Sequence, residues 1–122
     1  MGHVERRGAV RIPAKLAMEI RLGDDEGRAK VHSLNVSANG VYFKTPRFIP
    51  VLTRLDITLD LPVDSEDDVP GETVVCSGVV VRTVPELETP GVPEYEIACY
   101  FTSIDEADRD TLEAYILKQV AF

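Results

Sequence analysis

The sequence predicts a mainly β protein, in which six antiparallel strands form a small Greek-key barrel or a sandwich and one α-helix closes the chain. Two observations predict this class. Apolar and polar residues alternate through most of the sequence, which is the period of half-buried strands, and near residue 103 the apolar spacing changes to the three- and four-residue steps of an amphipathic helix. The short connections between the strands favour antiparallel pairing.

The chain has 122 residues and a hydrophobic content of 44%, which suit one domain with its own core. We expect a flexible N-terminal segment over residues 1–10 and a single domain over residues 11–122, with the barrel at about 11–102 and the helix at about 104–120. No apolar run approaches the roughly 20 residues that span a bilayer. The first residues also lack the apolar middle region of a secretory signal, so we expect a cytoplasmic protein without membrane insertion.

The strands are predicted from alternation in chain order. Apolar residues occupy every even position from Ile12 to Leu22, which indicates one half-buried strand. The β-branched run at 73–84 contains Gly78, which favours a bulge or a bend of the barrel. In the run at 95–101 the alternate residues from Tyr95 to Phe101 share one face. The six predicted strands cover residues 12–22, 28–34, 40–44, 54–61, 73–84 and 95–101.

Turns and a helix complete the organisation. Flexible and polar residues at 23–27 predict a turn, and the acidic stretch 62–72 is typical of a solvated connection. Either Ser103, followed by Glu106, or Asp105 is expected to cap the final helix. Its apolar face is predicted to consist of Leu112, Tyr115, Ile116 and Val120.

Cysteines and histidines give no sign of a catalytic or metal site. Cys76 and Cys99 lie inside strand-like runs, where a free cysteine usually behaves as a small buried hydrophobe, although a disulfide is open if their strands are neighbours. His3 and His32 have no cysteine or serine at a suggestive spacing. We therefore expect neither an enzyme nor a metal protein.

Charge points to a compact anion as ligand. The formal net charge of −8 argues against DNA or RNA, since Lys and Arg dominate the binding of nucleic acids. Residues 1–11 differ from the rest, because Arg6, Arg7 and Arg11 stand against Glu5 alone. The planar fork of arginine pairs with phosphate and with the O6 and N7 acceptors of guanine, so the segment suits a guanine nucleotide. The alternative is a solvated basic N-terminus.

A second polar stretch, residues 35–40, separates two apolar runs. In an extended segment the side chains of Asn35 and Ser37 would point the same way, and Gly40 permits either a positive φ or a close backbone approach. Such a turn offers an amide, a hydroxyl and backbone N–H groups to one ligand. The alternative is a plain Asn-Gly hairpin turn, which this dipeptide favours.

Together the two stretches resemble the signature of the PilZ domain family, an RxxxR motif followed some 20 to 30 residues later by [D/N]xSxxG. The first is Arg7-Gly8-Ala9-Val10-Arg11, preceded by Arg6, and the second is Asn35-Val36-Ser37-Ala38-Asn39-Gly40. The predicted strands and the closing helix also follow the family order. The resemblance covers nearly the whole chain.

The resemblance implies a six-stranded, split-barrel-like PilZ β-barrel with a C-terminal helix that binds cyclic di-GMP, a bacterial second messenger, and needs no further cofactor. By this resemblance Arg7 and Arg11 contact phosphate and guanine, and Arg6 is a further contact. Asn35, Ser37 and Gly40 shape the guanine site, although many strong binders have Asp in place of Asn35.

Two functions remain open at this point. The first is a receptor that transmits the messenger level to a downstream effector protein as its N-terminal segment becomes ordered, in a process such as motility. The second is a PilZ-fold adaptor that binds protein partners and not the messenger. The retained RxxxR motif favours the receptor, because known non-binding relatives usually lack it.

Overall fold

A computed structural model describes residues 9–23, 27–62 and 71–120 of the chain. Most of the predicted acidic connection 62–72 lies outside these residues, as do Arg6 and Arg7. The described elements are β1 (Ile12–Pro13), β2 (Ala17–Leu22), β3 (Arg28–Val36), β4 (Gly40–Thr45), β5 (Arg54–Leu61), β6 (Glu72–Val84), β7 (Tyr95–Ile104) and α2 (Glu106–Val120).

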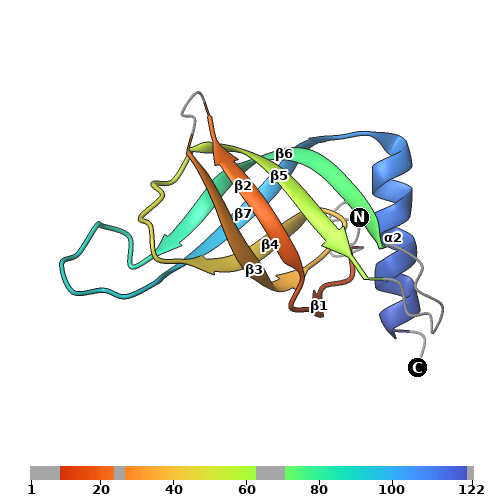
Figure 1. Ribbon diagram of the computed structural model, residues 1–122, viewed down its shortest axis with the longest axis horizontal. Coiled ribbons are helices and arrows are strands. Elements are labelled where there is room, and N and C mark those ends of the chain that lie inside the picture. The colour runs from red at the N-terminus through yellow and green to blue at the C-terminus, as the bar shows by residue number, and fades with distance from the viewer. Residues whose placement is uncertain (1–8, 24–26, 63–70, 121–122) are drawn as a thin grey trace, which may run out of the picture.

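Six of these strands form a closed antiparallel barrel (Figure 1). Around the barrel the strands follow the order β3, β2, β5, β6, β7 and β4, and pairing of β4 with β3 closes the ring. Strands β5, β6 and β7 are joined as successive hairpins while β4 lies beside β7, which is a Greek-key arrangement. The predicted fold class is therefore confirmed, and the barrel is the correct one of the two alternatives.

The inward faces of the strands form one core, as their alternation predicts. In β7 the buried side chains include Tyr95, Ile97, Cys99 and Phe101, and β5 buries alternate residues from Leu55 to Leu61. Two residues of α2, Leu112 and Ile116, are also buried, so the helix adds to this core. The helix stands at one end of the barrel, on the right in Figure 1, and packs mainly against β6.

The helix begins directly after Asp105, the second of the two residues predicted to cap it. Ser103 lies within β7, whereas Asp105 directly precedes α2 and its carbonyl oxygen accepts a hydrogen bond from the Arg109 N–H at 2.8 Å. The apolar face is shorter than predicted, because Val120 is 46% exposed.

The prediction of one strand from Ile12 to Leu22 is wrong, because the chain leaves the sheet after Pro13 and re-enters it at Ala17. The buried hydroxyl of Ser33 fills the gap: it accepts a hydrogen bond from the Leu16 N–H at 2.9 Å and donates one to the Ala14 carbonyl. β1 is therefore a short pairing with β3, and its last residue is Pro13, which has no N–H donor.

Gly78 marks a bulge, as predicted, since the β6–β7 register shifts between Ser77 and Gly78. A Cβ at Gly78 would lie 2.6 Å from the sulfur of Cys99.

Cys76 and Cys99 are both free and buried, although β6 and β7 are neighbours. Burial raises the pKa of each thiol from its ordinary 9.0 to about 12, which is the behaviour of small core residues. Within the described residues, no helix has the length and apolar character needed to cross a membrane.

Candidate functional site

The fold brings together four of the six predicted site residues. Arg11 immediately precedes β1, and β1 pairs with the end of β3, where Pro13 stands opposite Asn35. Ser37 and Gly40 follow in the turn that leads from β3 into β4. Residues 24 to 29 positions apart in the sequence therefore lie together where β3 passes into β4. The other two predicted residues, Arg6 and Arg7, are outside the described part of the chain.

Arg11 and Asn35 are joined directly. The Nη1 group of Arg11 donates a hydrogen bond to Oδ1 of Asn35 over 3.1 Å. The arginine is exposed, and this bond uses one of its five N–H donors. The bond engages the amide oxygen of Asn35, which is the acceptor of that side chain, so its Nδ2 group is left as a donor.

The turn from Ser37 to Gly40 is held by its own hydrogen bonds and by β7. The Ser37 N–H donates to the Gly40 carbonyl at 2.9 Å, and the Asn39 N–H donates to Oγ of Ser37 at 3.1 Å. The Asn39 carbonyl accepts from the Phe101 N–H at 2.8 Å. Ser37 thus stands where β3 passes into the turn, and its N–H and its hydroxyl are both engaged by bonds within that turn.

Gly40 serves close packing rather than a left-handed turn. Positive φ values occur at Gly23, Leu52 and Gly91 among the described residues, so neither Asn39 nor Gly40 adopts the conformation that an Asn-Gly hairpin turn requires. A Cβ at Gly40 would lie under 3.0 Å from the Cys99 carbonyl oxygen. Of the two alternatives for this glycine, close backbone approach is the one observed.

A cavity of about 200 Å³ lies beside this turn. Three of the predicted residues, Arg11, Ser37 and Gly40, line this cavity, whereas Asn35 does not. Among the described residues that line it, Arg11 is the charged one, Ser37 and Asn39 have polar side chains, and the others are small, apolar or aromatic. The lining residues are Ala9, Arg11, Ser37, Asn39, Gly40, Val41, Val81, Ala98, Cys99 and Tyr100. Such a cavity suits a ligand that combines an anion with a flat apolar surface.

Residues of β6 and β7 form a wall of this cavity that was not predicted from the sequence. Tyr100 is 53% exposed and Val81 is 52% exposed, and both line the cavity beside the small side chain of Ala98. In β7 alternate residues are buried, and Tyr100 occupies one of the outward-facing positions between them. An outward-facing aromatic side chain could therefore have been recognised from the sequence. Its position next to Gly40 depends on the β4–β7 register and is not recognisable in that way.

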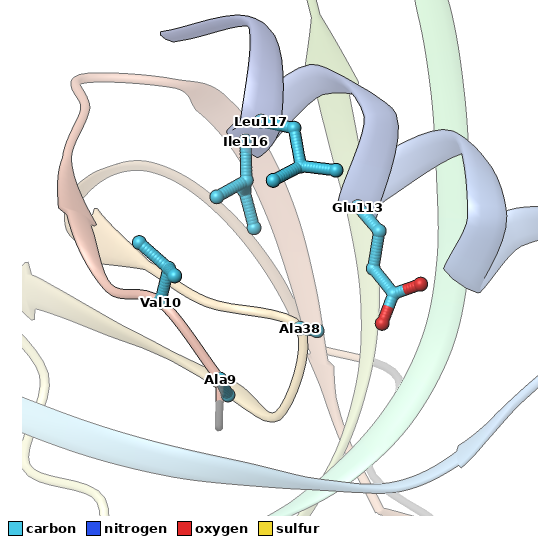
Figure 2. Close-up of a pocket in the computed structure, with 6 residues that line it drawn as sticks. All are labelled: Ala9, Val10, Ala38, Glu113, Ile116 and Leu117. Carbon is cyan, nitrogen blue, oxygen red and sulfur yellow. The ribbon is translucent and has the colours of Figure 1, made fainter. Parts of the chain in front are cut away.

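A second cavity of about 230 Å³ lies between the segment before β1 and the helix (Figure 2). Ala9 and Val10 form one side of it, and Glu113, Ile116 and Leu117 of α2 form the other. Ala38, from the middle of the β3–β4 turn, lies between them in Figure 2. The helix is therefore next to both predicted segments.

Elsewhere on the barrel, two pairs of polar side chains bond to each other. Arg21 and Asp56 form an ion pair at 3.0 Å, and hydrogen bonds from Arg21 and Ser77 lower the pKa of Asp56. The hydroxyl of Tyr42 donates to Glu96, and this bond raises the pKa of Tyr42. In the described part of the chain no group of three or more His, Cys, Asp or Glu residues could hold a metal ion.

Solved structures confirm this barrel architecture. The chain is similar to the Bacillus subtilis inhibitor of motility MotI/DgrA, with a TM-score of 0.74 and 22% identity over 93% of this chain and 51% of that one. It is also similar to K. pneumonia MrkH, with a TM-score of 0.62 and 15% identity over 92% of this chain and 48% of that one. A complex of MrkH with c-di-GMP matches with a TM-score of 0.57 and 15% identity over 95% and 53% of the two chains. The chain thus spans about half the length of each of these proteins.

A search of curated proteins finds no match to the chain. The family model described as PilZ domain matches residues 5–118, which include both predicted motifs and every described element up to the last turn of α2. The chain belongs to the PilZ domain family.

Proposed function

We propose that this PilZ domain is a receptor for cyclic di-GMP. The observation that carries the proposal is the hydrogen bond between Arg11 and Asn35, because it joins the two motifs beside a cavity that contains Ser37 and Gly40. Cyclic di-GMP has two phosphates and two guanines. The positive side chain of Arg11 and the exposed aromatic ring of Tyr100 both line this cavity and match that chemistry. The similarity to a MrkH structure that contains c-di-GMP supports the same ligand.

In this proposal the arginines supply charge and the turn supplies shape. Arg11 contacts a phosphate and a guanine edge, where its planar fork forms two parallel hydrogen bonds. Arg7 and Arg6 add further contacts as the N-terminal RxxxR segment becomes ordered over the ligand. The polar groups of Asn35 and Ser37 select the guanine edge, and Gly40 keeps the turn close to β7.

Binding, rather than catalysis, is the proposed activity. Ordering a chain segment costs about 1 to 2 kcal/mol per residue in backbone entropy, so several charge-assisted contacts must form together. That requirement makes the segment a switch whose ordered form a downstream effector protein recognises. We place the protein in the bacterial cytoplasm, with motility as one candidate output because of the similarity to an inhibitor of motility.

Isothermal titration calorimetry tests the receptor directly. The wild-type protein should bind cyclic di-GMP at micromolar concentration, and Arg11→Ala and Ser37→Ala should each weaken binding at least roughly tenfold. Arg28→Ala is the matched control, since Arg28 is exposed and begins β3 at the end opposite Asn35. Absence of binding by the wild type at tens of micromolar ligand would contradict the receptor and favour the adaptor.

A further inference from the structure

Arg109 of the helix contacts the turn at the centre of the proposed site. Its Nη1 group donates a hydrogen bond to the carbonyl oxygen of Ala38 over 3.1 Å, although the two residues are 71 positions apart. Arg109 is partly exposed and Ala38 is buried, so the contact lies at the edge of the helix–barrel interface. No motif in the sequence marks this arginine.

The bonded carbonyl belongs to the peptide group that also holds Ser37. The C=O of Ala38 and the N–H of Asn39 are the two ends of one planar unit. Arg109 binds the carbonyl end, while the N–H end donates to Oγ of Ser37 at 3.1 Å. A rotation of this peptide plane would therefore break both bonds at once, and Ser37 would lose the partner that orients its hydroxyl toward the turn.

The next peptide group is fixed independently. The carbonyl of Asn39 accepts from the Phe101 N–H of β7 at 2.8 Å, so consecutive carbonyls of the turn are bound by two different elements. Figure 2 shows Ala38 on the side of the turn that faces α2. The peptide that orients Ser37 thus depends on the helix, whereas the following one depends on the sheet.

We propose that Arg109 is a positioning residue for the ligand site, which it acts on through the Ala38–Asn39 peptide and the hydroxyl of Ser37. The proposal rests on the function proposed above, because it assigns a role in that same site. Without Arg109 the peptide samples other orientations, and only a fraction of the molecules has Ser37 in the binding orientation. Apparent affinity falls in proportion to that fraction.

Asp108 provides a matched control on the same helix. Its Oδ2 accepts a hydrogen bond from the Val75 N–H at 3.2 Å, so it also ties α2 to the barrel, but at β6 rather than at the turn. Asp108→Ala therefore tests whether any loss comes from helix docking in general. Lys118→Ala removes one positive charge from the same helix, as Arg109→Ala does, and so tests a plain charge effect.

Calorimetry and amide hydrogen exchange on the full chain test the proposal together. Arg109→Ala should weaken cyclic di-GMP binding roughly tenfold and speed exchange at the Asn39 amide in the ligand-free protein. Asp108→Ala and Lys118→Ala should change affinity less than about twofold and leave exchange at Asn39 unaltered. Equal losses of affinity in Arg109→Ala and Asp108→Ala, or unchanged exchange at Asn39 in Arg109→Ala, would overturn the proposal. If the wild type binds no cyclic di-GMP, the receptor function fails, and the exchange measurement alone decides whether Arg109 positions the turn.

Discussion

Arg11 and Asn35 are joined by a hydrogen bond of 3.1 Å that links the segment before β1 to the end of β3. The bond holds the guanidinium of Arg11 against Oδ1 of Asn35, and Arg11 also lines the cavity beside the β3–β4 turn. A carboxylate at position 35 would accept two donors from arginine, whereas the amide accepts through its oxygen only. The pairing therefore makes residue 35 a determinant of how firmly Arg11 is held.

Asn35→Asp should strengthen this pairing and tighten cyclic di-GMP binding by roughly three- to tenfold, because Arg11 would be held in place before the ligand arrives. Asn35→Leu should weaken binding by at least as much. Calorimetric titrations at matched ionic strength measure both changes. An unchanged affinity in Asn35→Asp would show that the amide already serves as well as a carboxylate.

Gly40 is the position where the turn tolerates a side chain least. A Cβ there would lie under 3.0 Å from the Cys99 carbonyl oxygen, which belongs to the backbone of a central strand and cannot move aside. Gly40→Ala should lower the free energy of unfolding by about 3 kcal/mol, measured by urea denaturation.

Gly91→Ala is the control for this substitution. Gly91 has a φ of +86°, and a Cβ there would meet nothing within 4 Å, so only the left-handed backbone opposes the change. That cost is about 1 to 2 kcal/mol. If the two variants were equally stable, the close approach at Gly40 would not be a constraint on the turn.

The barrel was predictable because its strands alternate between apolar residues that face the core and polar residues that face solvent. In β5 and β7 this alternation is visible in the sequence of each strand alone. The break after Pro13 was not predictable from the sequence, because apolar residues such as Leu16 continue at the even positions across it. What ends the strand is the hydroxyl of Ser33, 17 residues beyond Leu16, which bonds the groups that a ladder would have used. Hydrogen bonds between the backbone and a side chain distant in the sequence leave no pattern in the local sequence.

The same distinction separates the site residues that were predicted from those that were missed. Arg11, Asn35, Ser37 and Gly40 stand in two short motifs, so their residue types and spacing were sufficient to single them out. Arg109 and Tyr100 reach the turn through the packing of α2 and the register of β7. Neither relationship has a fixed spacing, and only the folded chain reveals it.

The two buried thiols predict a loss of stability at alkaline pH. Burial raises the pKa of Cys76 and Cys99 from 9.0 to about 12, so the folded state favours the protonated form. Their contribution to stability is fully present below pH 9.0 and is lost as the pH rises toward about 12. The free energy of unfolding should fall by up to about 1.4 kcal/mol per pH unit for each thiol in this window.

Urea denaturation at about pH 7.5 and about pH 10.5 checks this dependence. The double variant Cys76→Ala, Cys99→Ala should be less stable at the lower pH, because cavities replace the thiols, but its stability should change less between the two values. Tyr42 and Tyr115 also have raised pKa values and contribute equally in both proteins. Identical pH dependence in the two proteins would rule out the thiols as its source.

Tyr100 should stack on a guanine of the ligand. Its side chain is 53% exposed and lines the cavity with Ala98, whose small side chain leaves room for a ring beside Gly40. Stacking of a base on an aromatic side chain contributes about 1 to 3 kcal/mol, so Tyr100→Ala should weaken cyclic di-GMP binding by roughly ten- to a hundredfold. Tyr100→Phe keeps the ring without the hydroxyl and should retain near wild-type affinity in calorimetry. Equal losses in both variants would assign the contribution to the hydroxyl and refute stacking, while unchanged affinity in Tyr100→Ala would place the guanine elsewhere on the barrel.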